Sequence, residues 1–189
     1  PEEQSPNPYV TPELCLDFHY FAMRKFHFLL RAAALVVFPG GFGTLDEALE
    51  TLTLVQTGKR YSLPLILIDE PGGSYWLQCL DFFEKELLVR GYISKTDFNL
   101  FECVQSVDEA VARINRFYSR YHSLRYVGDR LVIRLQSALP QEKLRELENR
   151  FTDILVPGGC ITAGSALEEE SDVPEINHLP RLMVDFNQA

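Results

Sequence analysis

The sequence predicts an α/β protein built on a Rossmann-like, doubly wound parallel sheet, followed by a small α+β appendage. Apolar segments rich in β-branched residues alternate with segments that carry helical signals, an order typical of βαβ units. The segments 33–38 and 64–68 are continuously apolar and do not alternate with polar residues. Such runs are expected for strands of a parallel sheet that is covered on both faces.

The first helix is expected to begin at Pro12 and to run to about Ala32. Thr11 suits its N-cap, and proline is favoured at the first helical position. The segment is apolar over much of its surface, so we expect it to be buried on more than one side, by the sheet and by a partner subunit. The apolar residues that set this expectation are Leu14, Phe18, Phe21 and Leu29.

A second helix is expected over 44–57, because Gly58 suits the C′ position that ends a helix. It is followed by a helix over 74–89, a helical turn over 93–101, a strand over 102–104 and a helix over 106–119. The last helix starts with a capping-box signal at Ser106 and Glu109. We assign residues 1–119 to one domain.

The pattern changes after Tyr121, and residues 120–189 are expected to form a separate, small α+β domain. Gly128-Asp129 separates two apolar runs, as in a β-hairpin. The later elements expected are an amphipathic helix over 140–151 and strands over 153–156 and 179–186. We interpret Pro157-Gly158-Gly159 as a plain turn and the acidic run Glu168-Glu169-Glu170 as a solvated loop.

Net charge and residue spacing argue against several classes of function. The formal net charge of the 189 residues is −9, so nucleic-acid binding, which needs a basic surface, is not expected. No apolar run approaches about 18 residues, so we expect no membrane span and a cytoplasmic location. Cysteines and histidines are scattered without metal-ligand spacing, so no metal site is expected. We expect free thiols, with Cys15, Cys79 and Cys103 buried among apolar neighbours.

Residues 39–47, Pro-Gly-Gly-Phe-Gly-Thr-Leu-Asp-Glu, form a glycine-rich turn between a strand and a helix. Glycines allow backbone angles that other residues avoid and a close approach of the backbone to a ligand. Thr44 stands where an N-cap or a phosphate-binding hydroxyl would lie, and the helix N-terminus behind it favours an anion. The alternative is that the turn is only a tight connection. It is not a Walker A loop, because no Gly-Lys-Ser/Thr follows.

The pattern Pro-Gly-Gly-x-Gly-Thr-x-x-Glu resembles the signature of the "Lonely Guy" (LOG) family, nucleoside 5′-monophosphate phosphoribohydrolases long mislabelled as lysine decarboxylases. Arg24-Lys25 matches the second element of that signature, and the resemblance extends from Pro8 to Asp69. Domains of this family carry further strands and helices, with another Gly-rich loop, before this point. The resemblance therefore implies that residues 1–119 are the C-terminal part of a LOG-type nucleotide-binding domain whose N-terminal part is missing from the sequence.

The resemblance implies that Arg24 and Glu47 are the catalytic pair. Glu47 lies one turn into the helix, where its carboxylate would reach the ribose of a phosphate-bound nucleotide and stabilise an oxocarbenium-like transition state. The alternative for Glu47 is ordinary stabilisation of the first helical turn. Asp46 and Glu50 are expected to contact solvent or helix neighbours, and the alternative for Glu50 is that it faces the site one turn on. The residues assigned to phosphate binding are Gly40, Gly41, Gly43, Thr44 and Lys25.

The function expected is hydrolysis of the N-glycosidic bond of a nucleoside monophosphate such as AMP, with no cofactor, by a homodimer. A non-catalytic nucleotide-binding or carrier module using the same loop is the alternative. A lysine decarboxylase would need a pyridoxal-phosphate lysine in a recognisable setting, and the sequence shows none.

Overall fold

The computed structural model describes residues 8–15 and 18–187 of the chain. Its first helical segments are the 3-10 helix η1 (Pro12–Leu14) and the helix α1 (Phe21–Leu30). The single long helix expected from Pro12 is therefore wrong. Thr11 does precede η1, but Cys15 is already extended, and α1 starts afresh after Tyr20.

A three-stranded parallel sheet follows, with the order β1-β2-β3. It is formed by β1 (Leu35–Val37), β2 (Leu65–Ile68) and β3 (Glu102–Val104). Leu35 pairs with Leu65, and Ile68 pairs with Val104. All three expected strands are confirmed, and this mixed α/β part of the chain is compatible with a Rossmann-like fold.

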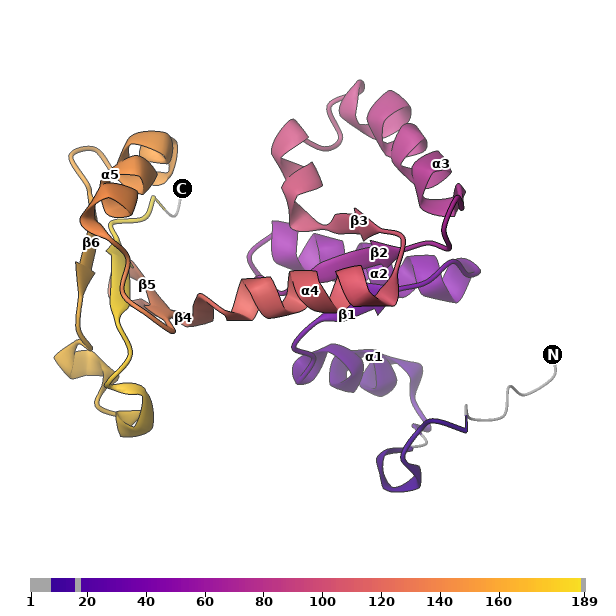
Figure 1. The fold of residues 1–189 in the computed structure, drawn as a ribbon, viewed down its shortest axis with the longest axis horizontal. Helices are drawn as coiled ribbons and strands as arrows, with labels where there is room; N and C mark the ends of the chain where they lie inside the picture. The colour runs from indigo at the N-terminus through magenta and orange to yellow at the C-terminus, as the bar shows by residue number, and fades with distance from the viewer. Residues whose placement is uncertain (1–7, 16–17, 188–189) are drawn as a thin grey trace.

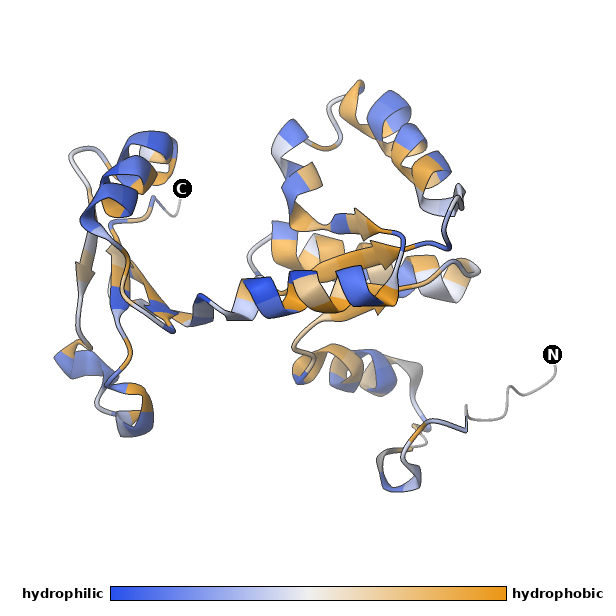
Figure 2. Ribbon diagram, viewed as in Figure 1, coloured by the Kyte–Doolittle hydropathy of each residue, from blue (hydrophilic) through white to orange (hydrophobic). Residues whose placement is uncertain are grey.

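Helices cover both faces of this sheet, which explains why every residue of β2 is buried. The helices α2 (Phe42–Gln56) and α3 (Tyr75–Phe82) pack on the face that carries Leu35, Val37, Leu65 and Leu67. The helix α4 (Val107–Tyr118) packs on the other face, against Ile66, Ile68 and Val104. The strands appear as an apolar layer between these helices in Figure 2.

Helix boundaries differ from the expected ones in two places. The helix α2 begins at Phe42 with Gly41 as its N-cap, so the first of the two roles expected for Thr44, that of N-cap, is wrong, and phosphate binding stays a prediction. The helix expected over 74–89 is α3 continued by a π-helical segment, η2 (Phe83–Leu88). The expected turn before β3 is the 3-10 helix η3 (Lys95–Leu100). The cap of α4 is confirmed, since the Glu109 N–H donates to Ser106 Oγ at 3.2 Å.

A second, antiparallel sheet of four strands has the order β4-β5-β7-β6. Its strands are β4 (Tyr121–Val127), β5 (Arg130–Leu135), β6 (Ile161–Gly164) and β7 (Arg181–Val184). The helix α5 (Gln141–Arg150) packs on one face through Leu144 and Leu147. In Figure 1 the two sheets lie apart, and α4 runs from the first toward the second.

The strand expected over 153–156 is wrong. The 3-10 helix η4 (Thr152–Ile154) occupies that position, and only a single bridge joins Leu155 to Phe186. The 3-10 helix ends only at Ile154, and the turn at Gly158, whose φ is +76°, follows soon after. The extended segment between them is therefore too short for a strand. β7 pairs with β5 on one side and with β6 on the other, and the sequence analysis did not anticipate β6.

The acidic run is not a solvated loop. It forms the 3-10 helix η5 (Glu168–Glu170), which is followed by η6 (Pro174–Ile176). Glu168 and Glu169 are exposed, but Glu170 is completely buried and forms ion pairs with Arg134 at 2.7 Å and Arg181 at 2.9 Å. A buried carboxylate needs such partners, because burial of an unpaired charge is very costly.

The four cysteines are free. Cys79 and Cys160 are half-buried, whereas Cys15 and Cys103 are exposed, so the expected burial of these two thiols is wrong. In the part of the chain that the structure describes, no helix is long and apolar enough to cross a membrane. The expected cytoplasmic location stays a prediction.

Candidate active site

The glycine-rich loop leaves β1 and turns directly into α2. Gly41 is extended, with φ −87° and ψ −160°, and the Thr44 N–H donates to its carbonyl oxygen at 3.1 Å. None of Gly40, Gly41 and Gly43 has a positive φ. The expectation that these glycines supply unusual backbone angles is therefore wrong, and their role is to leave space.

The three glycines leave space in different ways. A Cβ on Gly40 would collide with Oγ1 of Thr44, so this glycine lets the loop pack against the first turn of α2. A Cβ on Gly41 or Gly43 would meet no atom within 4 Å. The backbone at these two positions is thus open to an approaching ligand.

Arg24 of α1 and Glu47 of α2 face each other. Arg24 Nη2 donates to Glu47 Oε1 at 3.2 Å, although the two residues are 23 positions apart in the sequence. The Arg24 side chain is 53% exposed, whereas that of Glu47 is only 15% exposed. The two residues expected to form the catalytic pair are therefore in contact, with the carboxylate held inside and the guanidinium reaching solvent.

The second carboxylate oxygen of Glu47 is a buried polar atom without a partner. Oε2 has no hydrogen bond among the residues that the structure describes. Orphaned buried oxygens are rare and cost about 1–3 kcal/mol, and they mark sites where a ligand or water completes the hydrogen bonding. Glu47 lies in a cavity of about 460 Å³ that Arg24, Gly43 and Thr44 also line. The apolar part of its wall comes from Phe28, Phe38 and β1.

Lys25 lies outside this cavity. Its Nζ contacts Asp46 Oδ2 and Glu50 Oε2, each at 2.7 Å. The hydrogen bonds to Asp46 and then to Glu50 raise the pKa of Lys25. Asp46 and Glu50 were expected to contact solvent or helix neighbours. Both side chains do reach solvent, but they also tie α2 to α1 through Lys25.

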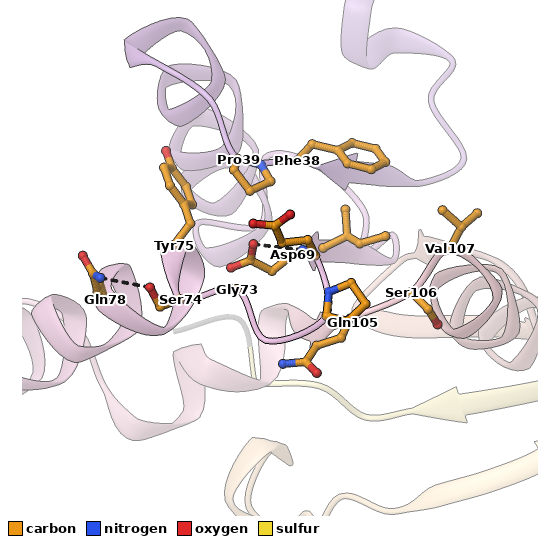
Figure 3. Close-up of a pocket in the computed structure, with 13 residues that line it drawn as sticks. Phe38, Pro39, Asp69, Gly73, Ser74, Tyr75, Gln78, Gln105, Ser106 and Val107 are labelled. Atoms are coloured by element: carbon orange, nitrogen blue, oxygen red, sulfur yellow. Dashed lines mark hydrogen bonds between the residues drawn. The ribbon is translucent and has the colours of Figure 1, made fainter.

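A larger cavity of about 970 Å³ opens on the other side of Phe38 and Pro39 (Figure 3). It lies at the carboxyl ends of the strands, where ligands of open α/β sheets bind. Its wall carries two acidic side chains, Asp69 and Glu70, as well as Tyr75 and Gln105. Two carboxylates disfavour an anion in this cavity, whereas the guanidinium of Arg24 lines the smaller one.

Over the described ranges, no group of three or more His, Cys, Asp and Glu side chains is arranged to hold a metal ion. The site therefore offers a carboxylate, a guanidinium and backbone N–H groups at a helix N-terminus. These groups can bind an anion and stabilise a developing positive charge next to it.

Sequence reasoning missed Tyr75 and Phe28. The Tyr75 hydroxyl donates to the Gly40 carbonyl at 2.6 Å from 35 residues away. Phe28 enters the cavity because it lies one helical turn after Arg24, on the same face of α1. No local pattern marks Tyr75, whereas the helical spacing from Arg24 could have pointed to Phe28.

A family model described as "possible lysine decarboxylase" matches residues 1–114 of the chain. Among curated proteins, cytokinin riboside 5′-monophosphate phosphoribohydrolase LOG1 of Arabidopsis thaliana is 30% identical over 101 residues. That match covers 53% of this chain and 46% of the relative.

Two further relatives carry related names. Cytokinin riboside 5′-monophosphate phosphoribohydrolase LOG3 of Arabidopsis thaliana is 30% identical over 50% of this chain and 42% of its own length. The probable phosphoribohydrolase LOG4 of Oryza sativa subsp. japonica, named for the same substrate, is 28% identical over 60% of this chain and 46% of its own length. The chain thus spans less than half the length of the curated relatives it matches.

Proposed function

The chain belongs to the LOG family, and from that premise we propose that it hydrolyses the N-glycosidic bond of a nucleoside 5′-monophosphate such as AMP. The products are the free base and ribose 5-phosphate. The observation that carries this proposal is the carboxylate of Glu47, which is held at one oxygen by Arg24 and has its other oxygen buried and unpartnered.

The phosphate is proposed to bind at the N-terminus of α2. The open backbone at Gly41 and Gly43 allows close approach, and Gly43 and Thr44 line the cavity that contains Glu47. Gly40 keeps the loop packed on Thr44. The helix dipole and the exposed guanidinium of Arg24 attract the anion. Lys25, already paired with Asp46 and Glu50, is proposed to add positive potential at the edge of this site.

A phosphate at this position places the ribose over the first turn of α2, next to Glu47. In the reaction the bond between C1′ and the base nitrogen breaks, and a water oxygen bonds to C1′. The proton that the water loses balances the one that the leaving base gains. The carboxylate of Glu47 stabilises the positive charge that develops on the sugar and orients the water, while Arg24 fixes the carboxylate. This chemistry needs no cofactor.

The first test is release of adenine from AMP by the wild type and by Glu47→Gln. We expect the variant to bind nucleotide but to lose about 100- to 1,000-fold in rate, because the charge disappears while the volume stays. Arg24→Ala should lower both rate and affinity. The matched control is Glu102→Gln. It removes a carboxylate from another Arg–Glu pair, in which Arg113 Nη1 and Glu102 Oε2 are 3.3 Å apart. Glu102 does not line the cavity of Glu47.

The results separate two functions. If the wild type binds AMP and other monophosphates but releases no base, the chain is a nucleotide-binding or carrier module and not an enzyme. If Glu47→Gln keeps the activity of Glu102→Gln, the assignment of the catalytic carboxylate is wrong.

We also propose that the protein forms a homodimer through α1. Met23, Phe26 and Leu30 on this helix are 47%, 60% and 51% exposed, which is unusual for so many apolar side chains on one short helix. Leu29 is buried within the chain, and the side chains of Leu14 and Phe21 lie outside the described residues.

Light scattering should give a dimer mass that Phe26→Glu reduces to a monomer mass. Val89→Glu, at another exposed apolar position, should leave it unchanged; a wild-type monomer at all concentrations contradicts the proposal.

A further inference from the structure

Tyr75 connects the start of α3 to the glycine-rich loop. Its hydroxyl donates to the carbonyl oxygen of Gly40 at 2.6 Å. In Figure 3 the ring rises from α3 beside Pro39; Tyr75 lines the larger cavity, and Pro39 lines both cavities. This is a hydrogen bond between a side chain outside the motif and the backbone inside it.

Tyr75 is held firmly at this position. The next residue, Trp76, is 3% exposed, and its indole Nε1 donates to the carbonyl oxygen of Ile68 at 2.9 Å. The Trp76 backbone N–H donates to Asp69 Oδ2 at 3.3 Å. The rings of Tyr75 and Trp76 meet edge to face, with centroids 4.8 Å apart. The first turn of α3 is thus anchored to the end of β2, and this fixes the backbone position from which the Tyr75 side chain extends.

The bond from Tyr75 fixes the orientation of one peptide group. The described part of the chain has no cis peptide bond, so the C=O of Gly40 and the N–H of Gly41 point in opposite directions. With the carbonyl directed to the Tyr75 hydroxyl, the Gly41 N–H is directed away from that hydroxyl. No hydrogen bond among the described residues uses this N–H as a donor.

The same bond constrains Thr44. Gly40 is packed so closely on the Thr44 side chain that a methyl group would not fit between them. Holding Gly40 therefore also holds the hydroxyl of Thr44, which lines the cavity with Arg24 and Glu47.

We infer that Tyr75 is a positioning residue for the phosphate-binding loop, an inference that rests on the function proposed above. It acts through Gly40 by directing the Gly41 N–H toward the phosphate, and it does not touch the substrate itself. Its effect belongs to affinity for the phosphate group and not to the bond-breaking step.

The test is Tyr75→Phe, which removes only the hydroxyl. The chain offers a matched control in Tyr118, whose hydroxyl donates to the carbonyl oxygen of Ala33 at 2.5 Å. Ala33 precedes β1, whereas the glycine-rich loop follows it. Both variants lose one tyrosine-to-backbone hydrogen bond beside the same strand. Calorimetry gives the Kd for ribose 5-phosphate and for AMP, steady-state assays give KM and kcat for AMP, and thermal melting confirms folding.

Tyr75→Phe is expected to weaken ribose 5-phosphate and AMP binding by about 3- to 10-fold, the value of one lost hydrogen bond. KM should rise by the same factor while kcat stays within about twofold, because the lost interaction stabilises the bound substrate and the transition state equally. Tyr118→Phe should leave Kd, KM and kcat within about twofold of the wild type. This split supports the positioning role.

Several results overturn the inference. These are an unchanged Kd in Tyr75→Phe, a loss confined to kcat, an equal loss of affinity in both variants, or a wild type that binds no ribose 5-phosphate. If the wild type binds AMP without cleaving it, the proposed hydrolysis fails. The ratio of the Kd values still decides the role of Tyr75 in that case.

Discussion

At the scale of single residues, the glycines of the loop divide into two kinds. Gly40 is required by its own neighbour Thr44, whereas Gly41 and Gly43 face open space. The sequence pattern alone treats the three positions alike. The structure therefore separates a glycine that shapes the loop from two glycines that expose the backbone.

This difference predicts different effects of alanine. Gly40→Ala should destabilise the protein by about 1–3 kcal/mol, because the methyl group overpacks against Thr44. Gly43→Ala should leave the free energy of unfolding unchanged and weaken ribose 5-phosphate binding, because the methyl group occupies space that the ligand needs. Urea unfolding and calorimetry measure the two quantities. Equal stability losses in both variants would contradict the assignment.

At the scale of elements, α2 carries the site and is fixed at both ends. It begins at Phe42, two residues earlier than the sequence suggested, which places Thr44 and Glu47 on the first turns of the helix. Its middle is tied to α1 by Arg24 and Lys25. It ends at Gln56, and Gly58, with a φ of +67° just after the C-cap Thr57, confirms the expected stop.

The helix end predicts a stability effect that is independent of the site. Gly58→Ala should cost about 1–2 kcal/mol in the free energy of unfolding, because a left-handed conformation is strained for a residue with a Cβ. Gly58→Asn should lose less, since asparagine tolerates this region. Denaturant titration measures both variants. The same loss in both, or none in Gly58→Ala, would show that the positive φ does not limit stability.

At the scale of the whole molecule, the two sheets have separate apolar cores. One gathers around β1 and β2, and the other around β5, β7 and α5. The face of the second sheet opposite α5 holds the Glu170 ion pairs with Arg134 and Arg181, which link η5 to β5 and β7. We propose that the boundary between the two domains lies between residues 119 and 120. Because Glu170 is a buried acid, we expect the stability of the C-terminal domain to depend on pH.

Burial alone would raise the pKa of Glu170, but the hydrogen bonds from Arg181, the Leu167 N–H and Arg134 together lower it. A carboxyl group with a lowered folded-state pKa stabilises the fold above its ordinary value of 4.5. This contribution is lost as the pH falls through the lowered pKa.

Circular dichroism should therefore show the protein losing stability in acid below about pH 4.5. Glu170→Gln should lose about 3–5 kcal/mol at neutral pH, because two buried arginines lose their partner. Its deficit should shrink on acidification. Glu168→Gln, on the exposed side of the same turn, should behave as the wild type at every pH. A deficit in Glu170→Gln that does not change with pH would rule out titration of this carboxyl.

The sequence by itself determined the strands of the parallel sheet, the end of α2 and the family to which the chain belongs. These features depend on local information: continuous apolar runs at 33–38 and 64–68, glycines at fixed offsets, and the spacing from Gly40 to Glu47. Such signals are visible within about ten residues, because backbone conformation and periodicity act at that range.

Tertiary structure alone decided which charges meet and which segments are buried. Arg24 reaches Glu47, Lys25 reaches Asp46, and Tyr75 reaches Gly40 across 21 to 35 residues. Glu170 looked like part of a solvated acidic run until the fold placed two arginines around it. A side chain's burial and pairing depend on what packs against it, and contacts between distant segments leave no periodic trace in one sequence.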